Sequence, residues 1–106
     1  MGHPSAANRK RQLNEAIRTL LPRATLDAHR RVLAVAEQGH LRHLPPSIAA
    51  WQAATTVARH EYTEYDRLLT EGYEPDAARH FVLEEINGQL AQWGCIRRIG
   101  DAGQTG

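Results

Sequence analysis

The residue types best suited to chemistry lie in one polar run near the middle of the sequence. They are spaced so that a helix would place them on one face, opposite the face that carries Tyr62 and Tyr65. The set is Arg59, His60, Thr63, Asp66 and Arg67. A histidine beside a carboxylate can transfer protons, and an arginine can bind an anion. No nucleophile is evident, so we expect hydrogen bonds that anchor a neighbouring helix, with a polar binding surface or acid–base chemistry by His60 and Asp66 as alternatives.

Histidine spacing gives only a weak indication of a metal site. His40 and His43 lie three residues apart and would need His60 or His80 as a further ligand. Prolines follow this pair closely, and no cysteine or acidic residue stands beside it at ligand spacing. The sequence HEYTE at residues 60–64 resembles half of a zinc-protease helix, but Glu64 stands where the second histidine is needed. We therefore predict no metal, no cofactor and no catalytic residue.

Charge is distributed unevenly along the 106 residues, although the net charge is only +1. Residues 1–60 contain nine Arg and Lys against three acidic residues, whereas residues 61–106 contain four Arg against nine acidic residues. Such asymmetry is typical of chains with an anionic partner. It also arises when two oppositely charged halves pack together, so charge alone leaves both interpretations open.

We predict that the basic residues of the first half meet on one surface of the first two helices. They are Arg9, Lys10, Arg11, Arg18, Arg30, Arg31 and Arg42. Together they would neutralise several phosphates of DNA or RNA without reading the base sequence. No glycine-rich phosphate loop, aromatic RNA-binding signature or zinc finger accompanies them. The alternative is a protein-interaction module with no nucleic-acid role, such as a homodimer in which the basic half of one copy meets the acidic half of the other.

Apolar periodicity predicts an all-α fold, a compact bundle of about four helices with one long central helix. The expected helices cover residues 9–21, 26–38, 48–71 and 75–93. In the first, Leu13, Ile17 and Leu20 or Leu21 are spaced to form one apolar stripe. Thr25 is the expected N-cap of the second, and Pro75 opens the fourth. We expect residues 1–8 to be a flexible N-terminus, residues 9–100 a single helical domain and residues 101–106 a disordered tail.

The third helix carries the clearest periodic pattern. Its apolar residues step by three and four positions, which predicts one buried stripe along a helix of about 24 residues. The stripe consists of Ile48, Trp51, Thr55, Ala58, Tyr62, Tyr65 and Leu69. For the same reason we expect the aromatic residues of this stripe, and Trp93, to pack in the core. In the fourth helix, Gly88 should cost about 1 kcal/mol relative to Ala unless close packing or a bend accounts for it.

Several motifs together resemble a known family. They are HLRHLPPSI at residues 40–48, the pattern R-H-x-x-T-x-Y-D-x-L-L at residues 59–69, GY at residues 72–73, DAARHFV at residues 76–82 and WGC at residues 93–95. This combination, which spans residues 30–99, resembles a bacterial and fungal family of small uncharacterised domains. The resemblance implies a fold unit and no established activity, so it assigns no catalytic residue.

Composition and patterning exclude several classes of protein. No run of about 18 uncharged apolar residues exists, so we predict no membrane span. No apolar block follows the basic run at residues 9–11, which argues against a secretory signal and favours a cytoplasmic protein. The single cysteine, Cys95, excludes an internal disulfide and is expected to be a half-buried structural thiol. Without a catalytic constellation, the sequence fits a non-enzymatic module better than an enzyme.

Overall fold

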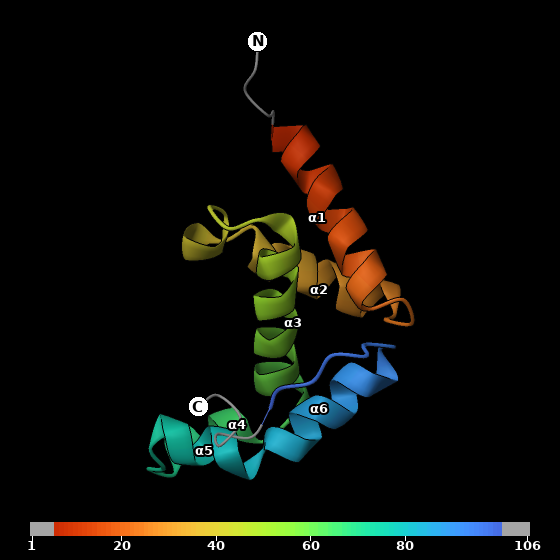
Figure 1. The fold of residues 1–106 in the computed structure, drawn as a ribbon. Coiled ribbons are helices and arrows are strands. Elements are labelled where there is room, and N and C mark those ends of the chain that lie inside the picture. Colours follow the sequence, from red (N-terminus) through yellow and green to blue (C-terminus); the bar gives the residue numbers. More distant parts are fainter. Residues whose placement is uncertain (1–5, 101–106) are drawn as a thin grey trace.

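The computed structural model describes residues 6–100, and every regular element in that range is a helix (Figure 1). The elements are α1 (Ala6–Leu20), α2 (Leu26–Ala36), the 3-10 helix η1 (Gly39–Leu41), α3 (Pro46–Tyr62), α4 (Tyr65–Thr70), α5 (Pro75–Phe81) and α6 (Leu83–Gln92). The prediction of an all-α fold is confirmed. Residues 6–8, expected to be irregular, belong to α1. The expected flexibility of residues 1–5 and disorder of residues 101–106 concern segments outside the described residues.

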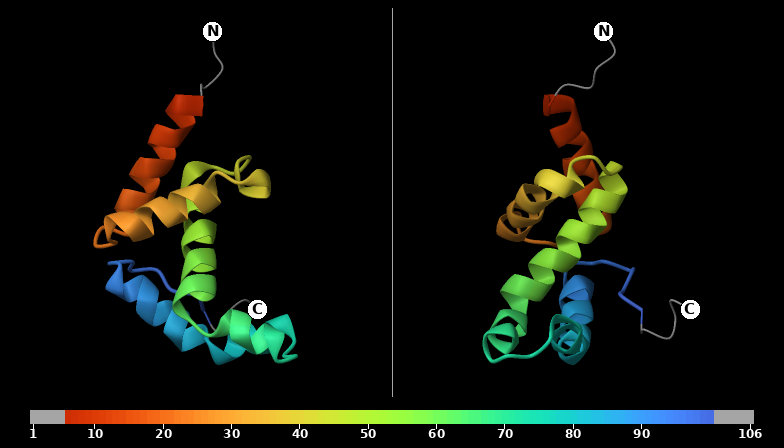
Figure 2. Two further views of the ribbon diagram at one scale, coloured as in Figure 1. Left: turned by 180° about the vertical axis from the view of Figure 1, so that it is seen from behind. Right: turned by 90° about the vertical axis from the view of Figure 1, so that its left-hand side faces the viewer.

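The central element is α3, against which the other long helices pack. Figures 1 and 2 show α1 and α2 beside its N-terminal half and α6 beside its C-terminal end. The covered face of α3 consists of small residues: Ala49, Ala50, Ala53, Ala54, Val57 and Ala58. Alanine favours the helix and lets neighbouring helices approach closely. The core is completed by the predicted apolar stripe of α1, in which Leu13, Ile17 and Leu21 are all buried.

The predicted stripe along the third helix was wrong in register. Of its seven residues only Ala58 and Tyr65 are buried, whereas Ile48 is 44% and Tyr62 40% exposed. The ring of Tyr62 makes a T-shaped contact with that of Trp93 at 5.3 Å between centroids and otherwise faces the outside. The pattern gave weight to large side chains, but the helices that converge on α3 pack best where its side chains are small.

The expected helix over residues 48–71 is divided at Thr63. Thr63 has an extended backbone, with φ −137° and ψ 178°, and ends α3. Its hydroxyl donates to the Arg59 carbonyl at 2.5 Å and accepts from the Tyr65 amide at 3.1 Å. These bonds satisfy backbone groups at the helix end, so the chain changes direction there at little cost.

The expected helix over residues 75–93 is also divided, at Val82, whose backbone (φ −102°, ψ 9°) departs from the helical values. Pro75 lies in the first turn of α5, as predicted. Gly94 has φ +87° and ends the helical region beside Pro22. The two divisions give six α-helices in residues 6–100, in place of the predicted four with one long central helix.

Substituting alanine for two glycines near the C-terminal end should change the stability of the fold in opposite directions. Gly88 is exposed inside α6, and a Cβ there meets nothing within 4 Å, so close packing does not account for it. We expect Gly88→Ala to raise the free energy of unfolding by about 0.5–1 kcal/mol. Gly94→Ala should lower it by more than about 1 kcal/mol, because φ is positive and the added carbon would lie 3.0 Å from Pro22 Cγ. Denaturant unfolding measures both, and a destabilising Gly88→Ala would contradict the open surroundings of that residue.

Candidate functional site

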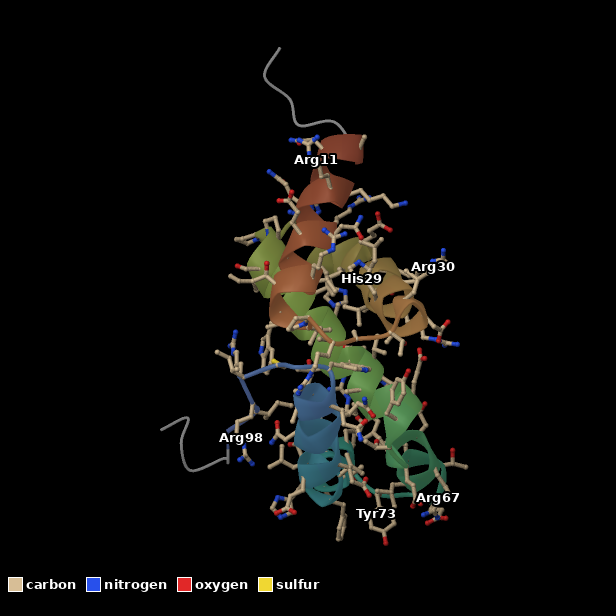
Figure 3. All side chains as sticks on the ribbon, turned by 90° about the vertical axis from the view of Figure 1, so that its right-hand side faces the viewer. Arg11, His29, Arg30, Arg67, Tyr73 and Arg98 are labelled. Atoms are coloured by element: carbon tan, nitrogen blue, oxygen red, sulfur yellow. The ribbon has the colours of Figure 1, made fainter. Side chains whose placement is uncertain are left out.

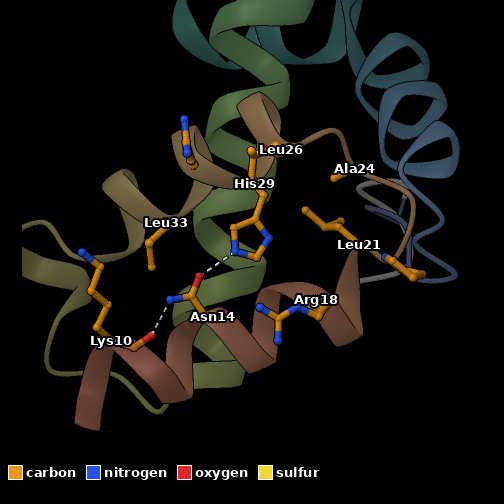
Figure 4. Close-up of a pocket in the computed structure, with 10 residues that line it drawn as sticks. Lys10, Asn14, Arg18, Leu21, Ala24, Leu26, His29 and Leu33 are labelled. Atoms are coloured by element: carbon orange, nitrogen blue, oxygen red, sulfur yellow. Dashed lines mark hydrogen bonds between the residues drawn. The ribbon is translucent and has the colours of Figure 1, made fainter. Parts of the chain in front are cut away.

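A groove of about 690 Å³ lies between α1 and α2 (Figure 4). Its floor is apolar and includes Leu21 and Leu33. Its polar lining includes three cations, Lys10, Arg18 and Arg30, and none of its lining residues carries a carboxylate. The cations therefore give this groove a positive electrostatic potential.

The local sequence explains how the two helices form the groove. Lys10, Asn14 and Arg18 are four residues apart, so they make one row along α1. Pro22 prevents α1 from continuing, and Thr25 starts α2 by accepting a hydrogen bond from the amide of Ala28 at 3.1 Å. This short link returns α2 to the side of α1, where Arg30 completes the lining.

His29 lies inside the groove and is held by α1. Its Nε2 is 2.7 Å from Asn14 Oδ1, and Asn14 Nδ2 donates to the Lys10 carbonyl at 3.1 Å (Figure 4). Because the amide nitrogen of Asn14 is already the donor to Lys10, its oxygen is the acceptor and His29 Nε2 is the donor. The other ring nitrogen, Nδ1, is left as the atom that takes up a second proton.

The groove keeps His29 neutral at physiological pH. Burial lowers the pKa of His29 below its ordinary value of 6.5, and the positive charge of Arg18 lowers it further. Both causes are properties of this groove, since one is its partial exclusion of water and the other is a cation that lines it. The negative charge of an anion bound there would act against that of Arg18 and raise the pKa of His29.

The structure brings together four of the seven basic residues that the sequence predicted to share a surface. Lys10, Arg18 and Arg30 line the groove, and Arg11 lines an adjacent hollow on α1. In Figure 3, Arg11 and Arg30 lie toward the opposite end of the molecule from Arg67. The charges that meet here therefore come from two helices and are separated from the C-terminal half.

The other three basic residues lie apart from the groove. Arg9 donates to a carbonyl of η1 at 3.3 Å. Arg31 is held between two carboxylates, with Nε 2.9 Å from Asp27 and Nη1 2.6 Å from Glu61. Arg42 is exposed at the end of η1. Two of the three thus have partners within the chain, which makes them less available to an external anion.

The polar run at residues 59–67 forms a second cluster, at the corner between α3 and α4. His60 Nδ1 is 2.6 Å from Asp66 Oδ1. The Arg59 guanidinium lies 5.2 Å from the centre of the Tyr65 ring, and the His60 ring meets the same ring in a T-shaped contact at 5.2 Å. The cluster therefore surrounds Tyr65, whereas the sequence analysis placed it on the opposite face. The Thr63 hydroxyl is bonded to the backbone, so it does not serve as a nucleophile for His60.

Arg67 does not join this corner cluster. It forms ion pairs with Glu64 and Glu71 on its own side of α4, the second at 2.6 Å. Burial lowers the pKa of Arg59, whose Nε is buried without a hydrogen-bond partner. The arrangement favours an anchoring role, since its contacts join the end of α3 to α4.

The sequence analysis missed His29 and Asn14 as members of a site. Neither belongs to a known motif, and both are common on ordinary helix surfaces. The spacing nevertheless indicated that Asn14 lies beside the two cations. It stands midway between Lys10 and Arg18, at the four-residue interval that places side chains in one row along a helix.

Two features that residues 6–100 lack bear on other classes of function. No group of three or more His, Cys, Asp or Glu side chains in this range is arranged to hold a metal ion. No helix in it combines the length and apolar character needed to cross a membrane. Cys95 is more buried than expected, and its Sγ donates to the Arg97 carbonyl at 3.2 Å.

Comparison with known proteins places the chain in a family. A family profile described as "Uncharacterized conserved protein (DUF2293)" matches residues 14–94. The chain belongs to this family. The match covers Asn14, Arg18, His29 and Arg30 of the groove, while Lys10 and Arg11 precede it. It agrees with the resemblance to a family of uncharacterised domains. No match to this DUF2293 chain was found among curated proteins or among solved structures.

The position of His29 predicts a specific pH dependence of stability. The unfolded chain takes up the histidine proton near pH 6.5, while the folded chain takes it up at lower pH. The free energy of unfolding should therefore fall as pH drops through 6.5, and level off once the folded form is also protonated. Denaturant unfolding of the wild type and of His29→Gln over this pH range measures this contribution.

The ring titration of His29 provides a direct check. An NMR titration should give a pKa below 6.5 in the wild type and a higher pKa in Arg18→Gln, because that change removes a nearby positive charge. Arg98→Gln is the matched control, since Arg98 is exposed far from the groove (Figure 3). An equal shift in both variants would mean that Arg18 exerts no specific effect.

Proposed function

We propose that the groove between α1 and α2 binds the phosphate backbone of double-stranded nucleic acid without reading its sequence. The observation that carries this proposal is the lining of one groove by Lys10, Arg18 and Arg30 with no carboxylate among the lining residues. A surface with unopposed cations attracts polyanions at long range and gains affinity when counterions leave the phosphates.

The residue types suit phosphate oxygens. Arginine offers a planar fork of N–H donors that binds two oxygens at once, and lysine adds a compact positive charge. Arg18 and Arg30 come from different helices, so a phosphate between them would be contacted from two sides. Such contacts hold a nucleic acid in place but carry no information about its bases.

The spacing of the cations matches a chain of phosphates. Lys10 and Arg18 are eight residues apart on α1, which corresponds to about 12 Å along the helix axis. That length spans about three to four nucleotides at roughly 3.4 Å of axial rise. The row on α1 therefore fits successive phosphates of one strand, and Arg30 widens the contact from α2.

The lining favours a duplex over a single strand. Proteins that bind single strands stack the exposed bases on aromatic rings. The groove contains no Tyr, Trp or Phe, and its one ring, His29, is hydrogen-bonded to Asn14. Contacts in this groove would therefore be to the backbone, which a duplex presents without unstacking its bases.

His29 should make the binding depend on pH. Protonation of its Nδ1 would add a fourth positive charge to the three of the lining. Binding should therefore strengthen as pH falls below neutrality, in parallel with the histidine titration.

The proposal predicts a characteristic response to salt. We expect the logarithm of the affinity for a short duplex to fall against the logarithm of the salt concentration with a slope of about −3, since each neutralised phosphate contributes about −0.9. Arg30→Gln and Lys10→Gln should each flatten the slope by about 1, with similar effects on duplexes of unrelated sequence. Fluorescence anisotropy with labelled duplex DNA and duplex RNA measures both.

The control is Arg98→Gln, which removes the same charge from the far end of the molecule and should leave the slope unchanged. A slope near zero, or equal losses in Arg98→Gln and Arg30→Gln, would reject this groove as the binding site. A protein-interaction module with no nucleic-acid role predicts instead that neither duplex binds measurably.

A further inference from the structure

A second groove lies on the other side of α1. Its volume is about 730 Å³, and its residues come from α1, from the start of α3 and from the segment that follows α6. Its apolar part includes Ala16, Leu20, Pro22 and Pro46. Ile96 stands at its edge. On α1 these positions face away from the row of Lys10, Asn14 and Arg18, because the two sets are about half a helical turn apart.

Ile96 is fully exposed, with a relative accessible area of 101%. The residues on either side of it are nevertheless held firmly. Cys95 is buried and its amide donates to the Leu90 carbonyl at 2.9 Å, while Asn87 bonds to both the amide and the carbonyl of Ile99 at 2.7 and 3.0 Å. The backbone that carries this large apolar side chain is thus anchored at Cys95 and at Ile99, which lowers the entropic cost of a contact made by it.

The rim of this groove carries one charge of each sign. Glu15 lies on the α1 side and Arg97 beside Ile96. The Arg97 guanidinium rests 4.1 Å from the centre of the half-buried Trp51 ring. Neither rim charge forms an ion pair with another of residues 6–100.

We propose that this surface is the contact of a symmetric dimer of the chain. A two-fold contact uses the same patch on both copies, so a protruding residue must lie beside the recess that receives its counterpart. Ile96 and the groove meet that condition. Ile96 of each copy would fill the groove of the other, and Glu15 of each copy would face Arg97 of the other, so the patch is complementary to itself in shape and in charge.

Charge complementarity also decides between a second copy and other occupants. A small apolar ligand would fill the groove but would leave Ile96 in water and both rim charges unpaired. The head-to-tail contact of a basic half with an acidic half is disfavoured, because five of the eight carboxylates in residues 61–100 are already paired within the chain, as with Glu64 and Glu71 on Arg67. A second copy would cover Ile96, fill the groove and pair both rim charges.

Sedimentation velocity from about 1 µM to about 1 mM tests the proposal. We expect a monomer–dimer equilibrium in the micromolar range, as is usual for contacts of limited area. Ile96→Asp should weaken the dimer by at least about tenfold, because a charge would enter an apolar recess. The matched control is Phe81→Asp, which alters a 63% exposed apolar residue elsewhere, beside Tyr73, and should leave the dimer intact.

Charge reversal tests the pairing itself. Glu15→Arg and Arg97→Glu should each weaken the dimer by about tenfold, since like charges would then oppose each other, and the double variant should restore it. Circular dichroism verifies that each variant is folded. A wild type that stays monomeric at every concentration, or a dimer that survives Ile96→Asp, overturns the proposal; failure of the double variant to recover overturns the charge pairing. None of these measurements involves nucleic acid, so the outcome is independent of the phosphate-binding groove.

Discussion

The small side chains along one face of α3 are the constraint on which the rest of the structure depends. All six are between 0% and 1% exposed, so α1, α2 and α6 rest directly on this helix. α3 packs against both α1 and α2, and these two helices diverge from their link toward the N-terminus of α1 and the C-terminus of α2 (Figures 1 and 2). The basic groove is the space between them. α3 contributes no residue to its lining and still determines its shape.

Hydrogen bonds of one side chain explain where α3 ends, and the contacts around this point give the pattern at residues 59–69 a structural role. Thr63 ends α3 by bonding to the backbone on both sides of itself. Arg59 and His60 then pack against Tyr65 at the start of α4, and Asp66 holds the His60 ring. The residue types and spacings of this pattern are those that an anchored corner requires. The side chains for which acid–base chemistry was an alternative make contacts that join two helices.

The sequence predicted the features that depend on short-range periodicity and missed those that depend on tertiary contacts. The stripe of Leu13, Ile17 and Leu21 and the N-cap at Thr25 follow from spacing alone, and both are present. The buried face of α3 was missed because alanine contributes little to an apolar pattern, although it determines how closely helices pack. Likewise, Arg31 looked equivalent to its neighbour Arg30, and only the fold brings Glu61 to it from thirty residues away.

The relative position of the two grooves on α1 determines where the basic grooves would lie in a dimer. A two-fold contact through the apolar groove would place the two basic grooves on outward-facing sides of the dimer, because they lie on opposite sides of the same helix. Linking two binding sites increases avidity for one ligand only when that ligand can reach both. A straight duplex cannot reach two surfaces that face apart. A dimer of this geometry would therefore present its two basic grooves to different stretches of ligand, and the two sets of phosphate contacts would add no avidity on one straight duplex.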